Sequence, residues 1–252
     1  EHIERDRNTT AWGKEISKIY GFSAKIPLDD CKKYNVTVIV NIDGHEVRLS
    51  RLSLKYFAPL SASFKYSYCQ KENWIISADK NIIHLRKTTI VRKIARELKL
   101  LAELFIRNTY GGRQAVFTRL YVRLYNFFKC KPVWLISDRA SIAGDNGEAF
   151  FRYMRENHKE VDARYVILPE SKDFERLKKI GPVVEKGSRK HKFLSLVSEY
   201  IISSHAENEI YNPIGNRICT FKDIWSDRKF VFLQHGITQN DVSNWLGKYN
   251  KN

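Results

Sequence analysis

The strongest restriction on the fold is a regular alternation of short apolar runs and amphipathic segments in residues 132–234. Five runs are short and apolar enough to be buried strands: PVWLIS, ARYVIL, PVVEKG, EYIISS and RKFVFLQ. Helical patterns follow the first three of them: GDNGEAFFRYMREN, SKDFERLKKIG and KHKFLSLVS. Buried strands separated by helices predict a parallel sheet that is covered by helices on both faces. We therefore assign residues 132–252 to an α/β domain.

Residues 22–86 have a different hydrophobic pattern, with a period of two. In NVTVIVNIDGHEVRLS, alternate residues share one face: Val36, Val38, Val40 and Ile42. Asp43-Gly44 is a hairpin turn signal, and HEVRL is the expected return strand. SASFKYSYC places Phe64, Tyr66 and Tyr68 on one side, and NWIISADKNIIHLRK is typical of two strands around a turn. We expect a small antiparallel β module, sandwich-like, preceded by a polar segment at residues 1–21 that is helical at best.

Residues 87–131 have a helical period. The first helix carries an apolar stripe of Ile90, Ile94, Leu98, Leu101 and Phe105. Gly111-Gly112 breaks it. The second helix has Val116, Leu120, Leu124 and Phe127 on one side.

Positive charge is concentrated in this helical region. The chain has 44 Lys and Arg against 28 Asp and Glu, a net charge of +16. Residues 86–131 contain 12 basic residues and only two acidic ones, Glu97 and Glu103. Such a chain should bind something anionic, whether nucleic acid, an acidic membrane leaflet or a polyanionic substrate.

Basic amphipathic helices edged with aromatic residues suit a membrane surface with anionic lipids. The predicted membrane-binding residues are Arg92, Lys93, Arg96, Lys99, Arg107, Arg119 and Arg123. The alternative is that both helices pack on a neighbouring domain and their charges are solvated. RNA stacking is a third reading, but no RNP, KH or helix-turn-helix pattern accompanies the helices, so we expect no nucleic-acid partner.

Composition and motif content exclude several further classes of protein and site. No stretch approaches the roughly 18 apolar residues of a membrane-spanning helix, and no signal peptide is visible. The four cysteines, at positions 31, 69, 130 and 219, form no CxxC pair, so we expect free thiols in the cytoplasm and neither a zinc site nor a disulfide framework. Because the chain opens on Glu1 and stops inside a polar helical pattern at Asn252, we expect a segment of a longer protein.

Several polar residues follow the predicted strands directly. In an open parallel sheet, functional groups gather outside the carboxyl ends of the strands. Arg139, His205 and His235-Gly236 all fall there. His235 is the strongest catalytic candidate, because a neutral imidazole can accept a proton from a hydroxyl and Gly236 permits close approach of a ligand. The alternative is that His235 only caps its strand.

The other candidates each have a structural alternative, which we favour for His205 and for Asp145 or Asn146. Asp145 or Asn146 is first of all a helix N-cap, and Glu148 favours the same helix end. Arg139 can clamp a phosphate or pair with a nearby carboxylate, and His205 can contact substrate or satisfy its loop. No GxGxxG, P-loop, HExxH or GxSxG motif occurs, and no metal-ligand cluster is visible.

Three of these stretches, taken together, carry a family resemblance. WLISDRASIAGDNGEAFFRYM, YIISSH and FVFLQHGITQNDVSNWLGKYNK, in that order and spacing, resemble the CDP-glycerol glycerophosphotransferases, the teichoic acid and related capsule polymerases and primases. The resemblance covers about residues 131–252. The β module and basic helices also resemble the membrane-associated region that often precedes this domain in the family.

The resemblance implies a GT-B architecture, in which two Rossmann-like lobes face a cleft. Residues 132–252 would be the acceptor-side lobe, and the second lobe, with most of the CDP-glycerol pocket, would be absent. His235-Gly236 matches the strand-end His-Gly motif whose histidine is the proposed general base. Many members read Trp-His-Gly-Thr-Pro there, whereas this chain reads Gln234-His235-Gly236-Ile237-Thr238, so a different acceptor is expected. We count Gln234 and Gly236 among the substrate-binding residues.

The implied reaction transfers glycerol phosphate, or a related polyol phosphate, from CDP-glycerol to a hydroxyl of a lipid-linked polyol-phosphate or glycan acceptor. His235 would deprotonate that hydroxyl, and its oxygen would attack the β-phosphorus and expel CMP. Arg139 and the Asp145-Asn146 loop would orient the acceptor. We expect no cofactor and no metal. The enzyme would work on the inner face of the cell membrane, and the segment alone would be inactive; a homo-oligomer is left open.

Two other functions are compatible with the sequence. The first is a non-catalytic, membrane-docked module that binds a polyanionic glycan. The second is a sugar-nucleotide glycosyltransferase of the same fold, because a fold does not fix the donor.

Overall fold

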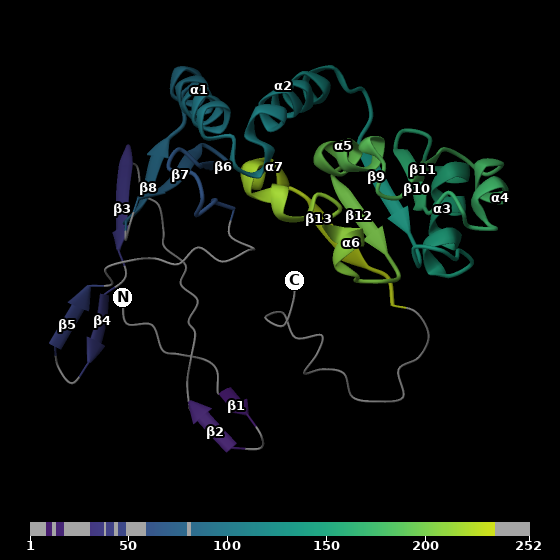
Figure 1. Cartoon of the computed structure of the whole chain (residues 1–252), viewed down its shortest axis with the longest axis horizontal. Coiled ribbons are helices and arrows are strands. Elements are labelled where there is room, and N and C mark those ends of the chain that lie inside the picture. Colours follow the sequence, from purple (N-terminus) through teal and green to yellow (C-terminus); the bar gives the residue numbers. More distant parts are fainter. Residues whose placement is uncertain are drawn as a thin grey trace. The chain divides into compact units, whose positions relative to one another are not determined.

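A computed structural model gives the fold of the chain (Figure 1). The structure describes residues 9–11, 14–17, 31–37, 39–42, 45–48, 59–79 and 82–234. The chain forms two compact units, Glu1–Tyr34 and Asn35–Asn252. In the first unit, β1 (Thr9–Ala11) and β2 (Lys14–Ser17) form an antiparallel pair. Residues 9–11 and 14–17 are therefore strands, whereas the sequence suggested at most a helix, and the β-branched Thr9 and Thr10 favour the extended form.

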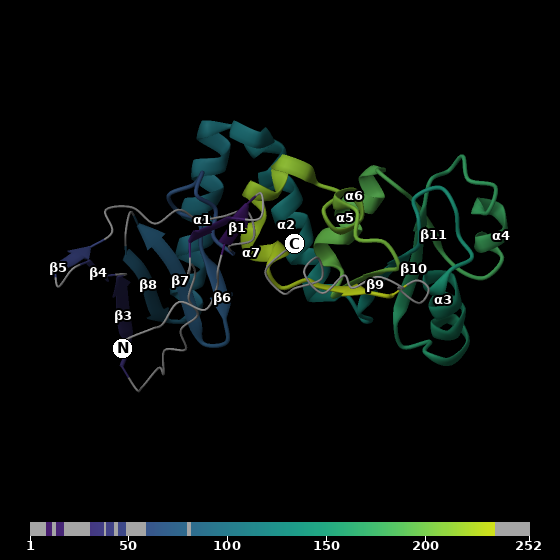
Figure 2. The ribbon, with the colours of Figure 1, turned by 90° about the horizontal axis from the view of Figure 1, so that it is seen from below.

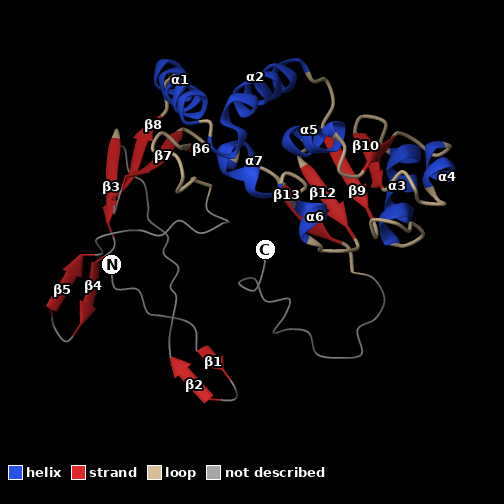
Figure 3. Ribbon diagram, viewed as in Figure 1, coloured by secondary structure: helices blue, strands red, loops and turns tan. Residues whose placement is uncertain are grey.

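The second unit contains a five-stranded parallel sheet. Its strands are β9 (Val133–Ser137), β10 (Asp162–Ile167), β11 (Val183–Glu185), β12 (Tyr200–Ser203) and β13 (Lys229–Phe232). Their order is β11-β10-β9-β12-β13, and every neighbouring pair is parallel. Figure 3 shows helices alternating with these strands. All five strands were predicted. Their order is that of a doubly wound sheet: β10 and β11 are added on one side of β9, and β12 and β13 on the other, so the strand order reverses between β9 and β12.

Helices cover both faces of this sheet. They are α2 (Gly112–Phe128), α3 (Asn146–Asn157), α4 (Phe174–Lys178) and α5 (Arg189–Val197). In β9, Val133 and Leu135 face the core under α2 and α5, while Ile136 faces the core under α3 and α4. A strand with apolar residues on both faces is what a sheet between two helical layers requires.

Three short helical segments connect β12 to β13. They are α6 (Asn208–Tyr211), the 3₁₀ helix η2 (Gly215–Thr220) and α7 (Lys222–Trp225). Phe221 and Ile224 pack into the same core as α2 and α5. This connection therefore belongs to the α/β part of the fold.

The upstream module is a four-stranded sheet packed on a helix. Its order is β3 (Lys33–Thr37), β8 (Ile82–Lys87), β7 (Trp74–Asp79) and β6 (Cys69–Lys71). β6, β7 and β8 pair antiparallel, which confirms the predicted β7–β8 hairpin. Helix α1 (Ile90–Arg107) places Leu100 and Leu104 against Phe64, Tyr68 and Ile75. In the described part of the module the partner of the four-stranded sheet is thus helix α1.

Two details of the module differ from the sequence pattern. β4 (Ile39–Ile42) and β5 (His45–Arg48) form the predicted hairpin, with Ile42 opposite His45. The expected single strand over residues 36–42 is nevertheless divided, because residues up to Thr37 belong to β3 in the other sheet. Residues 62–66 form turns instead of a strand, because the backbone N–H groups of Lys65 and Tyr66 donate to the Glu103 carboxylate on α1 (3.0 and 2.9 Å).

The break between the two basic helices lies at the predicted glycines. After α1, Asn108 is left-handed (φ 47°), and the 3₁₀ turn η1 (Thr109–Gly111) ends at Gly111 (φ 72°). A Cβ on Gly112 would lie 2.1 Å from the Leu104 carbonyl oxygen. Glycine at 112 therefore lets α2 start directly against α1.

The predicted free thiols are confirmed, since all four cysteines are unpaired. Within the residues that the structure describes, no helix is both long and apolar enough to span a membrane.

Candidate functional site

The predicted site residues gather at one edge of the parallel sheet. Asp138-Arg139 follows β9, Ser204-His205 follows β12, and Leu233-Gln234 follows β13. Figure 2 views the molecule from the side toward which these strands run. Because β9, β12 and β13 are neighbours, residues far apart in the chain share this carboxyl-end edge, as the switch-point rule predicts.

Asp138 organises the edge. Its side chain is 1% exposed and accepts hydrogen bonds from Ser204 Oγ (2.8 Å), Tyr165 Oη (2.8 Å) and the Gly147 N–H (2.7 Å). Burial and the Asp138 charge raise the pKa of Tyr165, so the phenol stays protonated and donates. One carboxylate thereby ties β9 to β10, β12 and α3.

The same carboxylate accepts hydrogen bonds from the free backbone N–H groups at the N-terminus of α3. Asp138 also accepts from the backbone N–H of Glu148 (3.1 Å) and Asp145 (3.2 Å). The Asp145 side chain accepts from Asn146 N–H (2.8 Å), as an N-cap. The helix-end donors that bind anions in many proteins are therefore already satisfied from within the chain. A Cβ on Gly147 would lie 2.3 Å from Asp138 Oδ1, so only glycine permits this approach.

The loop between β9 and α3 is fixed along its length. Ala140 O accepts from Leu168 N–H (2.9 Å), and Ala143 N–H donates to Asp173 (3.0 Å). Glu148 is buried and bound by Arg176 (2.8 Å), whose hydrogen bonds lower the pKa of Glu148. Arg139 is thus presented from a rigid loop.

The side chains at the surface of the edge are joined in two pairs. Arg139 Nε donates to His205 Nε2 (3.1 Å), so His205 accepts through that nitrogen as a neutral imidazole. The Asn146 side-chain amide donates to the backbone carbonyl of Gln234. Leu233 N–H donates to Ser203 O (2.8 Å). The chain just before His235 is therefore anchored to both α3 and β12.

A small cavity lies beneath the edge. It has a volume of about 10 Å³, room for one water molecule, and is lined by Ser137, Asp138, Lys186 and His191 among others. Gly187 N–H donates to His191 Nδ1 (3.0 Å), which leaves the ring proton on Nε2. Burial lowers the pKa of His191 to about 4, and the charges of Lys186 and Lys192 act in the same direction. His191 is therefore neutral at pH 7.

Five predicted site residues are brought to the edge: Arg139, Asp145, Asn146, His205 and Gln234. His235 and Gly236 lie outside the described residues. Sequence reasoning missed the central role of Asp138 and the buried Ser204, Tyr165 and His191. A carboxylate directly after a buried strand was the available signal for Asp138. Among the residues described, no group of three or more His, Cys, Asp or Glu side chains is placed to hold a metal ion.

A family model, described as CDP-Glycerol:Poly(glycerophosphate) glycerophosphotransferase, matches residues 117–243, which is half of the chain. The chain belongs to this glycerophosphotransferase family. It is also 31% identical over 259 aligned positions to the minor teichoic acid biosynthesis protein GgaB of Bacillus subtilis (strain 168). That alignment covers all of this chain and 29% of the relative's length. No solved structure matches the chain.

The resemblance drawn from the three motifs is confirmed, and the glycerophosphotransferase match begins earlier, inside α2. It therefore includes the whole edge from Asp138 to Gln234. It also includes Arg119 and Arg123 of α2, both of which were predicted to bind a membrane.

Arg119 does not face a membrane, and that prediction is wrong. Its side chain is 0% exposed and pairs with Asp223 of α7 (2.7 Å) and Glu97 of α1 (2.9 Å). It also donates to Thr220 O (2.8 Å). Burial alone would lower the pKa of Arg119, but the two carboxylates raise it. The guanidinium therefore joins α1, α2 and α7 from the interior.

The other six predicted membrane residues divide into three pairs: two in ion pairs, two over an aromatic ring and two exposed. Arg123 also pairs with Asp223 (2.8 Å) but is 40% exposed, and Arg107 pairs with Glu103 (2.9 Å). Arg96 and Lys99 lie over the Tyr66 ring at 5.9 and 6.0 Å. Arg92 and Lys93 are exposed at the start of α1.

Proposed function

We propose that this chain is the acceptor-side lobe of a GT-B glycerophosphotransferase. The whole enzyme would transfer glycerol phosphate from CDP-glycerol to a hydroxyl of a lipid-linked acceptor in teichoic acid synthesis. One observation carries the proposal: the family match spans the edge where Arg139 binds His205 and Asn146 binds the Gln234 carbonyl, and His235 follows Gln234 directly. The doubly wound strand order is the order that each lobe of such an enzyme needs.

In this proposal the acceptor hydroxyl loses its proton to His235. Its oxygen forms a bond to the β-phosphorus of CDP-glycerol while the bond from that phosphorus to the bridging oxygen breaks, and CMP leaves with the electron pair. The imidazolium then releases its proton to solvent. Arg139 would stabilise the charge on the acceptor or the transferred phosphoryl group. The contribution of the lobe is positioning and electrostatic stabilisation, as in phosphoryl transfer generally.

A donor-competition assay tests this function. The full-length protein should release CMP from CDP-glycerol when a lipid-linked acceptor is present. Excess UDP-sugar should leave the rate unchanged, because the proposed donor is a CDP-polyol. Inhibition by UDP-sugars, with release of UDP, would favour the glycosyltransferase. Absence of nucleotide release with retained glycan binding would favour the non-catalytic module.

We further propose that α1 and α2 dock on the inner leaflet of the cell membrane. The described outer faces carry large apolar side chains that contact solvent. They are Ile90, Val91, Ile94, Leu98, Phe105 and Ile106 on α1, and Phe117, Leu120, Tyr121, Leu124, Phe127 and Phe128 on α2. The apolar stripe predicted for α1 is thus largely on the surface. Apolar residues flanked by basic ones are the pattern of an interfacial helix.

Charge reversal on α1 tests the docking. Replacing the basic set by glutamate should weaken binding to anionic vesicles at least ~100-fold, because each Lys or Arg near such a surface contributes about 1 kcal/mol. The set is Arg92, Lys93, Arg96 and Lys99. Co-sedimentation with vesicles measures the effect. A control with Lys172, Lys178, Lys179 and Lys190 reversed loses the same charge elsewhere and should bind far better. Equal binding by both variants would indicate that the α1 face is only a packing surface.

A further inference from the structure

A basic groove lies at the opposite end of the parallel sheet from the candidate site. It has a volume of about 570 Å³ and runs between the end of α2, the end of α3 and the starts of β9 and β10. Its lining consists of Tyr125, Phe128, Lys129, Cys130, Lys131, Arg155, Lys159, Val161 and Asp162. Lys131 precedes β9 and Asp162 begins β10. The groove is therefore separated from Asp138 by the length of β9, about 16 Å.

The groove holds cations that the chain does not neutralise. Within the part of the chain that the structure describes, neither Arg155 nor the Lys159 side chain makes a hydrogen bond or ion pair. Arg155 Nε is buried there without a partner, and the guanidinium is held over Gly181, where a Cβ would lie 2.8 Å from Nε. Lys131 Nζ donates to the Lys159 carbonyl (2.6 Å), which draws two cationic chain segments together.

The nearby carboxylates are already engaged. Asp162, the one acidic residue in the described lining, pairs with Arg164 (2.7 Å). Glu199 lies 3.6 Å from Lys129 Nζ. Arg155 lines the groove, and its guanidinium has no carboxylate partner among the described residues, so an external anion in the groove would be stabilised beside it.

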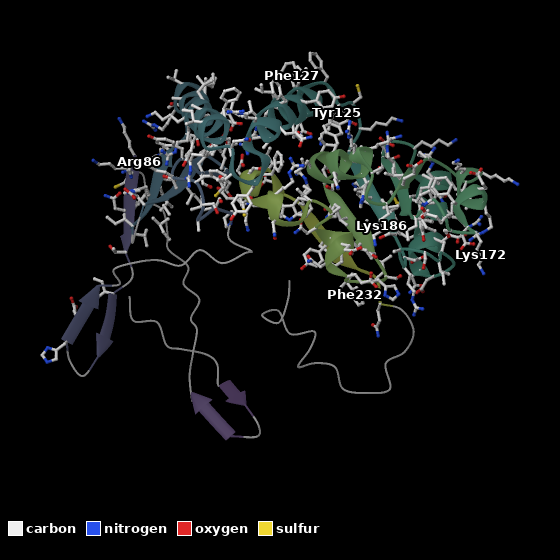
Figure 4. All side chains as sticks on the ribbon, viewed as in Figure 1. Arg86, Tyr125, Phe127, Lys172, Lys186 and Phe232 are labelled. Atoms are coloured by element: carbon white, nitrogen blue, oxygen red, sulfur yellow. The ribbon has the colours of Figure 1, made fainter. Side chains whose placement is uncertain are left out.

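Exposed aromatic side chains adjoin the cations. Phe128, in the lining, is 66% exposed, and its neighbour Phe127 is 82% exposed. Their rings are in edge contact, 5.0 Å between centroids. Figure 4 labels Tyr125 and Phe127 at this end of α2, and Phe232 at the other end of the sheet. A ligand that fits here has an anionic head and an apolar body.

We propose that this groove binds the phosphate of an anionic phospholipid headgroup, with Arg155 and Lys159 on the phosphate and the acyl chains along Phe127 and Phe128. This deepens, and rests on, the proposed docking of α1 and α2 on a membrane. The groove would provide one defined lipid-binding site, in addition to the general electrostatic attraction between the basic helices and an anionic membrane. Arginine suits such a site because its planar guanidinium can hold two phosphate oxygens at once.

Vesicle binding with a matched pair of variants tests the site. Arg155→Gln with Lys159→Gln should weaken binding to phosphatidylglycerol vesicles ~10-fold or more, and binding to phosphatidylcholine vesicles should not change. Lys172→Gln with Lys190→Gln removes the same charge from other parts of the surface and should change binding less than ~3-fold. Equal losses in the two double variants would overturn the proposal while leaving membrane docking intact.

Cys130 gives a second measurement that does not require vesicles. Its thiol is exposed in the groove, and Cys31 is an exposed reference elsewhere in the chain. Monomeric dihexanoylphosphatidylglycerol should slow maleimide labelling of Cys130 and not of Cys31, as read by peptide mass spectrometry. The Arg155→Gln, Lys159→Gln variant should lose this protection.

The outcomes separate the two proposals. Protection of Cys130 by the short-chain lipid, in a protein that fails to bind vesicles, would retain the lipid site and reject the docking. Equal protection by inorganic phosphate or glycerol 3-phosphate would mean that the groove binds any phosphate, and no protection by any of the three would mean that it binds none. Either result overturns the lipid site.

Discussion

Replacing His235 by alanine in the full-length protein is expected to lower the rate of CMP release about 10²- to 10⁴-fold, the usual contribution of a positioned general base. The proposed role of His235 is to take the acceptor proton, so binding of CDP-glycerol should change little. The rate of the wild-type enzyme should decrease as the pH is lowered past about 6.5, where an ordinary histidine becomes protonated. The variant should lose that acid limb, which a merely structural substitution would not remove.

His158 supplies the control for this variant. His158 lies in the same domain, at the C-terminal end of α3, where it pairs with Glu160 (2.8 Å). Asp138 binds the opposite, N-terminal end of that helix. His158→Ala should retain CMP release within about threefold. If the His235 variant kept near-normal turnover with unchanged circular dichroism, His235 would have no part in the reaction.

The parallel sheet could be predicted because its pattern is local. Each strand is a short apolar run, and each helix between them repeats its apolar residues at helical spacing. The gathering of Arg139, His205 and Gln234 at one edge also follows from the pattern, since parallel strands end on the same side. The upstream module was harder to predict. Phe64, Tyr66 and Tyr68 alternate as in a strand, but Glu103 on α1, far along the chain, binds the backbone of that segment and holds it in turns.

The role of each charged residue on α1 and α2 could not be predicted from periodicity. A stripe shows which residues share a face, and it does not show which face is buried. The stripe of Ile90, Ile94 and Leu98 is exposed, and it is the face next to it on α1 that buries Leu100 and Leu104. Arg119 was assigned to the membrane surface as one of the basic residues of two amphipathic helices. Its two carboxylate partners lie on other elements, and no local pattern links them.

Replacing Arg119 by methionine is expected to lower the free energy of unfolding by about 3–5 kcal/mol, because removing one member of a buried ion pair leaves the others uncompensated. Glu97 and Asp223 would remain, with side chains only 16% and 6% exposed. Urea unfolding followed by tryptophan fluorescence measures the change. Arg123→Met removes an arginine that contacts the same carboxylates from a half-exposed position and should lose at most about 1 kcal/mol. Similar losses in both variants would contradict a special role for the buried guanidinium.

The same network should make stability depend on pH through Glu97. Burial alone would raise the pKa of Glu97, but Arg119 and Arg123 outweigh it and lower the pKa from 4.5 to about 2. The stabilisation is therefore complete above pH 4.5 and is lost as the pH falls toward 2. Between pH 6 and pH 3, the difference in unfolding free energy between wild type and Glu97→Gln should narrow by about 2 kcal/mol. A difference that stays constant over this range would mean that Glu97 is not held ionised by Arg119, and that the ion pair between α1 and α2 does not contribute to stability.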